Sequence, residues 1–239
     1  GQSEIVGDVW EPLFGKFFFG TDQIGRDMLS MLIYGARNMI ALALLTTGCA
    51  FGLGSLLGFL AATMGGWVDQ VLSRFVDVVI SIPTLIFALI VLSSTGTSIF
   101  ALVTVIAIIY AMPVYRIARA VAMDIEVMDY VEAARLRGEG LWWIMRKEIL
   151  PNALTPLAAE FGLRFCFVFL LISGLSFLGL GLQPPLADWG AMVRDNGGGI
   201  AWGFMPPLVP ATCIALLTIG INLIVDSVVQ KASGLREDH

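Results

Sequence analysis

The sequence predicts an all-α integral membrane protein with five membrane-spanning helices. Hydrophobic residues make up 57% of the 239 residues and charged residues 14%, whereas soluble domains carry about 45–50% apolar and ~25% charged residues. The mean hydropathy is +0.85, and long runs contain no charge. A soluble enzyme could not bury this much apolar surface, and a disordered chain or nucleic-acid-binding protein needs far more charge. The net charge of −5 also argues against a nucleic-acid partner.

The first predicted span is residues 39–67, a run without ionisable side chains that is long enough to cross ~30 Å of hydrocarbon. Four glycines repeat in it at four-residue spacing, as Gly48 with Gly52 and Gly54 with Gly58. Small residues one turn apart let two helix backbones approach closely. We therefore expect this helix to pack against another at short distance.

The second and third spans come from a charge-free stretch that is too long for one crossing. The polar run at residues 93–98 divides this stretch, which predicts helices over 72–92 and 99–115. Pro83 and Pro113 fall inside these helices, where each removes a backbone hydrogen bond and can kink the axis.

The fourth and fifth spans are the apolar segments 152–182 and 207–229. The fourth contains Pro156 and two opposite charges, Glu160 and Arg164, four residues apart on one helical face. Isolated charges are costly at membrane depth, so this spacing predicts a mutual pair. The pair is either a gate element or a structural contact near the interface. Asp77 and Arg74, three residues apart, suggest a similar pair.

The sizeable polar segment of the chain runs from Asp124 to Pro151. Its first half predicts a short helix that ends at Gly138, a good left-handed C-cap. Its second half places tryptophans at the membrane interface, and Pro151 begins the next span in its first turn. The small residues on one face of the short helix suit a cleft in a soluble partner.

Basic residues are concentrated on one side of the predicted spans. The positive-inside rule places that side in the cytoplasm, with residues 124–150 and the tail 231–239, and leaves residues 1–36 and the loop 183–206 outside. The cytoplasmic group is Arg116, Arg119, Arg135, Arg137, Arg146, Lys147, Lys231 and Arg236, with Arg74 close by, and the outer group is Lys16, Arg26, Arg37 and Arg194.

Prolines, tryptophans and the glycine run 197–199 predict that residues 183–206 form a shaped, partly flexible loop. This loop either docks a partner outside the membrane or caps the pore.

The sequence offers no catalytic or metal site. The three cysteines, Cys49, Cys166 and Cys213, are far apart, and each lies in an apolar run. The single histidine, His239, is at the tail, and the sequence contains no Ser/His, paired-Asp or metal-ligand motif. No G-x-x-x-x-G-K-[ST] sequence for nucleotide phosphates occurs. We therefore expect no cofactor in this chain, and an intramembrane enzyme is disfavoured.

Within the polar segment, Glu132-Ala133-Ala134 is followed by Gly138 and then by Leu150-Pro151. This arrangement bears a resemblance to the EAA signature of the permease subunits of bacterial ABC importers. It implies that these residues couple the permease to its ATPase. Glu148 departs from the family pattern, which usually has an apolar residue at this position.

Further segments are similar to the peptide/nickel branch of these permeases, which includes the oligopeptide and dipeptide permeases of C type. The resemblance implies a type I importer bundle with six helices and both ends in the cytoplasm, so the family's first helix is expected to be missing from this chain. It divides the chain into an outer segment 1–36, a permease domain 37–230 with the coupling loop at about 120–151, and a tail 231–239. The segments that carry it are Gly20–Asp27, Tyr34–Arg37, Ser81–Pro83, Leu175–Gly181, Pro184-Pro185 and Asp188–Gly190.

The resemblance also implies a function and a set of partners in the bacterial inner membrane. The chain would form half of a pore with a second homologous permease, two cytoplasmic ATPases that bind ATP and magnesium, and an extracytoplasmic solute-binding protein. Short peptides are the expected solute, moved by alternating access, with nickel or metal chelates, glutathione and opines as alternatives in the same branch. An ion-coupled secondary transporter is the alternative outside this class, and it needs titratable groups near mid-bilayer.

Overall fold

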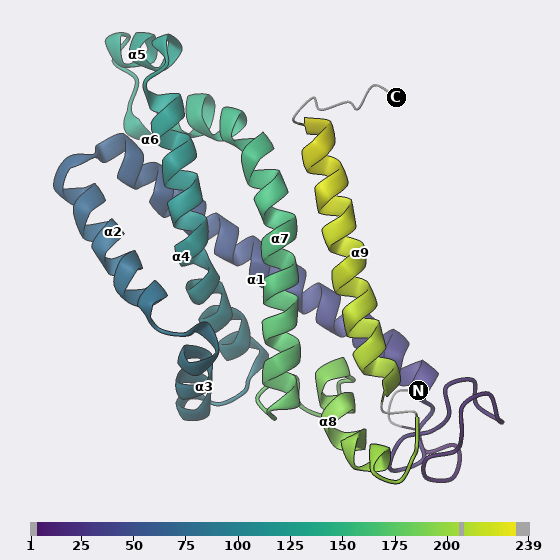
Figure 1. The fold of residues 1–239 in the computed structure, drawn as a ribbon. Coiled ribbons are helices and arrows are strands. Elements are labelled where there is room, and N and C mark those ends of the chain that lie inside the picture. Colours follow the sequence, from purple (N-terminus) through teal and green to yellow (C-terminus); the bar gives the residue numbers. More distant parts are fainter. Residues whose placement is uncertain (1–3, 206–207, 233–239) are drawn as a thin grey trace. The chain divides into compact units, whose positions relative to one another are not determined.

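The protein is helical throughout the part that the computed structural model describes, residues 4–205 and 208–232. Within this part there are isolated β-bridges but no strand. The elements are α1 (Met28–Met64), α2 (Gly66–Ser81), α3 (Thr84–Thr95), α4 (Ile99–Glu126), α5 (Asp129–Leu136), α6 (Leu141–Ile144), a π-helical segment (Met145–Ile149), α7 (Leu150–Phe177), α8 (Trp189–Ile200) and α9 (Leu208–Ala232) (Figure 1).

Four helices of the described residues are long and apolar enough to cross a membrane, and a fifth span arises if a bent pair counts as one. The four are α1, α4, the continuous helix Leu141–Phe177, and the segment Leu208–Ser227 of α9. The bent pair is α2 and α3, which meet at 88°. The all-α membrane fold is therefore confirmed, with the second span bent.

The predicted continuous helix over 72–92 is wrong, because the chain breaks between α2 and α3. Ile82 has extended backbone angles (φ −85°, ψ 127°), as expected for a residue that precedes proline. The hydroxyl of Ser81 donates to the carbonyl of Val78 at 2.7 Å, and Phe87 N–H donates to Pro83 O at 3.0 Å. Pro83 thus separates two helices, whereas Pro113 and Pro156 lie inside uninterrupted ones.

Several helix ends differ from the expected positions. α1 begins at Met28 rather than at residue 39, because the Asp27 carboxylate accepts hydrogen bonds from the N–H groups of Leu29 (3.3 Å) and Ser30 (3.1 Å). α4 continues to Glu126, well past the predicted end at 115.

The chain divides into two compact units, and each is described here by itself. The first lies within residues 1–45, 89–103 and 165–223, and the second within 46–88, 104–164 and 224–239.

In the second unit α1 packs closely on α4 through one of the two glycine pairs. A Cβ at Gly54 would lie 2.6 Å from Ala111 O, and one at Gly58 would lie 2.8 Å from Tyr115 O. Added Cβ atoms at Gly48 and Gly52 would meet nothing within 4 Å. The predicted close approach therefore holds for the 54/58 pair and not for the 48/52 pair.

In the first unit the segment before α1 lies against α8. The Gln23 N–H donates to Asn196 Oδ1 at 2.8 Å, and the rings of Trp10 and Phe204 stack with centroids 5.3 Å apart. Two segments that the sequence places on the same side of the membrane are thus in contact.

The glycine run 197–199 is part of α8, so the expectation of a flexible loop there is wrong. The helix is stabilised at its start, where the Asp188 carboxylate accepts a hydrogen bond from Ala191 N–H at 3.1 Å. Farther along, the Asn196 side chain donates to Met192 O at 2.9 Å.

Candidate coupling site

The short helix α5 ends in a glycine turn, as the sequence predicts. Gly138 has φ +84°, in the left-handed region. Its N–H donates to Arg135 O at 2.9 Å, and Glu139 N–H donates to Ala134 O at 3.2 Å. These two bonds form a Schellman motif, which satisfies carbonyls at the helix end.

α5 buries one face and exposes the other. Val131 and Ala134 are fully buried, three residues apart, in a cluster with residues of α1, α4 and α7. Glu132 and Ala133 are exposed, and the Leu136 side chain is 83% exposed. The result is a small helix held firmly by its inner face, with an outer face available to a partner.

Charged side chains hold α5 to its neighbours. Arg135 forms an ion pair with Glu126 at the end of α4, and its Nη2 also reaches Thr63 O of α1 at 3.5 Å. The Arg137 guanidinium lies over the Trp143 ring, 5.8 Å from the centroid. Within the described part of the chain Glu132 has no ion-pair partner, so its carboxylate is available for an external contact.

The second half of the loop leads into α7 through one wide helical turn. Leu150 N–H donates to Met145 O, five residues back, which gives the π-helical segment. Pro151 follows directly and has no N–H to give. The Asn152 side chain donates to Glu148 O at 2.6 Å, which satisfies a carbonyl in this distorted turn.

The predicted coupling residues fall on two separate elements. Glu132, Ala133, Ala134 and Gly138 belong to α5 and its C-terminal turn, and Leu150 and Pro151 lie exposed at the start of α7. Ile149 links the two groups, because it is buried in the same apolar cluster as Ala134.

A polar network between α2 and α4 was not predicted from the sequence. Arg119 binds the carboxylate of Asp69 with two nitrogens, and the Nη2–Oδ2 distance is 2.5 Å. The hydroxyls of Ser73 and Tyr115 lie 2.9 Å apart beside this pair. These residues are about 40 to 50 positions apart in the chain, so sequence spacing gave no signal of the contact.

One predicted ion pair is formed and another is not. Glu160 and Arg164 pair on α7, with side chains that are largely buried. The suggested pair of Arg74 with Asp77 is wrong, because Asp77 binds Arg116 of α4 at 3.0 Å. Both partners of that contact are about half exposed, so it contributes little stability.

In the first unit the carboxyl of Asp188 is almost fully buried. Burial raises its pKa above the ordinary value. Hydrogen bonds oppose this effect, including the Ser176 hydroxyl at 2.6 Å and the Ala191 N–H at 3.1 Å. Asp188 lies between α7 and α8, outside the spanning helices.

The profile of the binding-protein-dependent transport system inner membrane component matches residues 54–232. The matched region includes the polar segment, α5 and the start of α7. The chain belongs to this family. It is therefore a multi-pass membrane permease component of an ABC importer and not itself an enzyme.

Curated relatives cover most of the chain. The "Probable D,D-dipeptide transport system permease protein DdpC" of Escherichia coli (strain K12) is 34% identical over 91% of this chain and 73% of its own length. The di/tripeptide transport system permease protein DppC of Pseudomonas aeruginosa is 35% identical over 88% and 70%. The glutathione transport system permease protein GsiD of Pectobacterium atrosepticum is 30% identical over 87% and 69%.

Solved structures share the fold. A chain of the MetNI methionine ABC transporter, in inward-facing conformations, superposes with a TM-score of 0.68 at 20% identity, over 86% of this chain and 97% of the other. A chain of an amino acid ABC transporter crystallised with histidines gives a TM-score of 0.61 at 21% identity, over 83% and 92%. The predicted type I importer bundle is thereby confirmed as the fold.

Proposed function

We propose that this chain is one half of the pore of an ATP-driven importer for short peptides in the bacterial inner membrane. The family makes it an importer permease, and peptide permeases among its relatives support the solute class. A second homologous permease, two ATPases and an extracytoplasmic binding protein complete the transporter, in which transport proceeds by alternating access.

The coupling mechanism rests on one observation: α5 exposes one face and buries the opposite face in an apolar cluster. Val131 and Ala134 anchor the inner face of α5 in the buried cluster. A displacement of the exposed face by the ATPase, at Glu132, Ala133 or the Gly138 turn, is therefore transmitted to that cluster. That cluster includes Ala118 of α4 and Ala153 of α7. Closure of the ATPases would thus move two membrane-spanning helices together.

The start of α7 is the second part of the proposed coupling surface. Leu150 and Pro151 are exposed, and the π-helical turn before them departs from regular helix geometry. Such turns are frequent at functional sites. We assign this turn the role of the joint that connects the loop to the span.

In this proposal the Glu160–Arg164 pair stabilises the span and takes no part in ion-coupled transport. The two side chains neutralise each other, which leaves an ion-coupled carrier without a free titratable group at that position.

Transport in proteoliposomes tests the solute and the energy source. The complete transporter is reconstituted with ATP inside and the binding protein and a labelled dipeptide outside. We expect accumulation that requires ATP and persists with a proton uncoupler. Uptake without ATP that the uncoupler abolishes would instead indicate a secondary carrier.

Competition separates the solute classes within the family. Because one relative is a glutathione permease, unlabelled glutathione is compared with unlabelled dipeptide as competitor. Displacement by the dipeptide alone supports the peptide assignment, and displacement by glutathione alone favours the second candidate.

Charge reversal at Glu132 tests the coupling role. Glu132→Lys places a cation where the exposed carboxylate would meet a donor or basic group of the ATPase. We expect the ATPases to be lost on purification, or retained without uptake. Asp8→Lys, an exposed carboxylate in the outer segment, is the matched control and leaves ATPase co-purification unchanged. Glu237 in the tail, another suitable control, lies outside the described residues.

A further inference from the structure

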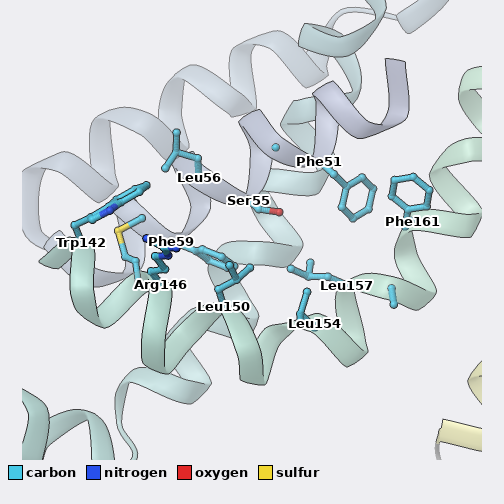
Figure 2. A pocket seen from close by; sticks show the side chains of 13 residues that line it. Phe51, Ser55, Leu56, Phe59, Trp142, Arg146, Leu150, Leu154, Leu157 and Phe161 are labelled. Atoms are coloured by element: carbon cyan, nitrogen blue, oxygen red, sulfur yellow. The ribbon is translucent and has the colours of Figure 1, made fainter. Parts of the chain in front are cut away.

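A long apolar groove runs along the second unit between α1 and the segment from α6 to α7. It encloses about 540 Å³. Figure 2 shows Phe51, Leu56 and Phe59 of α1 on one side and Leu150, Leu154 and Leu157 of α7 on the other. Of the proposed coupling residues, only Leu150 lines this groove.

The groove is polar mainly at one end. Arg146 lies there beside Trp142, which is 64% exposed, and Phe161 lies at the opposite end (Figure 2). Among the described residues Arg146 has no ion-pair partner. An unpaired guanidinium at the mouth of an apolar groove matches a ligand with an anionic head and a hydrocarbon body.

The dimensions fit one hydrocarbon chain rather than a helix. From Met145 to Phe161 the lining extends ~24 Å at ~1.5 Å per residue. Along α1 the lining runs from Phe51 to Phe59, ~12 Å. The volume of about 540 Å³ therefore gives a mean cross-section of roughly 22–45 Å². A hydrocarbon chain with contacts of ~4.0–4.5 Å needs about 16–20 Å², whereas a helix ~10 Å wide needs about 80 Å².

The length also agrees with one leaflet of a bilayer. Half of a membrane, including its headgroup region, is about 20–22 Å thick. Tryptophan and arginine are typical of the headgroup level. With Trp142 and Arg146 at the cytoplasmic surface, the far end at Phe161 falls close to the bilayer midplane.

We propose that this groove binds an anionic phospholipid of the cytoplasmic leaflet. One acyl chain lies between α1 and α7, and the phosphate group contacts Arg146. The proposal rests on the cytoplasmic placement of the loop made under the proposed function. Because the bound lipid contacts Leu150, it supports the joint between the coupling loop and the span.

Two variants test the site, each with a matched control. Arg146→Gln removes the cation, and Lys147→Gln removes a neighbouring cation that does not line the groove. Gly52→Leu fills the groove from α1, since a Cβ at Gly52 meets nothing within 4 Å. Gly48→Leu adds the same side chain one turn away, where space is equally open and no groove residue is replaced.

The measurement is phosphatidylglycerol retained by the complete transporter after purification from defined lipid mixtures, by native mass spectrometry. We expect the wild type to retain it in preference to phosphatidylethanolamine. Arg146→Gln should lower its affinity roughly fivefold, the effect of one basic side chain near a membrane surface. Gly52→Leu should abolish retention, and both controls should keep it.

Three results would overturn the proposal. If Lys147→Gln loses as much phosphatidylglycerol as Arg146→Gln, the lipid is held by diffuse surface charge. If a cysteine at position 56 cross-links to the second permease, the groove holds a protein. If the dipeptide displaces the lipid, the groove is part of the solute path. Transport by the wild type is measured on the same preparations, so failure of lipid binding is distinguished from failure of the proposed function.

Discussion

The contact between α1 and α4 predicts that alanine is harmful at Gly58 and harmless at Gly48. A Cβ at Gly58 would lie 2.8 Å from the backbone N of Arg119 and the O of Tyr115, and 2.9 Å from the Cβ of Ala118. Two of these three atoms belong to the backbone of α4 and cannot move by side-chain rotation. The two helices must therefore separate to admit a methyl group.

The magnitude follows from comparing the two glycines. Alanine gains up to ~1 kcal/mol over glycine in a helix, and this gain is common to both variants. Overpacking at Gly58 costs about 1–3 kcal/mol, whereas Gly48 has open space. The difference between the variants is thus about 1–3 kcal/mol. For a chain of this size, that difference lowers the melting temperature by roughly 2–12 °C.

The assay is size-exclusion chromatography of the detergent-solubilised transporter after heating to a series of temperatures. Gly58→Ala should lose its folded peak at a lower temperature than Gly48→Ala, with the wild type between them or equal to the better variant. If the two variants melt at the same temperature, the close approach of α1 and α4 is wrong.

Three further predictions concern a pH dependence, a turn and the membrane orientation. Because burial raises the pKa of Asp188 in the folded state, its contribution to stability is present below the unfolded value of ~3.9 and is lost as the pH rises through the folded value. As the pH is lowered toward the unfolded value, the apparent melting temperature of the wild type should therefore rise relative to that of Asp188→Asn, which lacks this contribution. Gly138 has φ +84°, where a side chain costs ~1 kcal/mol or more, and asparagine tolerates this conformation better than valine. ATP-driven uptake should therefore fall less in Gly138→Asn than in Gly138→Val. Equal uptake by the two variants would contradict the left-handed turn. The predicted orientation, with residues 1–36 outside and residues 124–150 in the cytoplasm, is tested in a background without native cysteines. Phe14→Cys should react with an impermeant maleimide in intact spheroplasts, and Leu136→Cys should react only after permeabilisation. The reverse pattern would overturn the orientation.

The sequence predicted the membrane fold well because its signal is compositional. Charge-free runs and the Gly138 cap depend on neighbours within one helix, and both appear in the structure. The ion pair of Glu160 with Arg164 is likewise local, four residues apart on α7.

Features set by distant parts of the chain were missed. Asp77 binds Arg116 rather than nearby Arg74 because the α2–α4 packing brings the former pair together. Only the packing of α1 on α4 decides which glycine pair is in contact. The glycine run in α8 is helical although glycine disfavours helix, since the helix is capped by Asp188 and contacts the segment before α1 through Asn196.

The central claim, that α5 is the surface on which the ATPase acts, is tested most directly by site-specific cross-linking. A photo-reactive amino acid is placed at Leu136, which is 83% exposed on α5. For comparison it is placed at Phe14, which is 73% exposed in the segment before α1. Illumination of the assembled transporter should join position 136, and not position 14, covalently to an ATPase subunit. An ATPase adduct from position 14, or none from position 136 in a transporter that imports its solute, would contradict the account.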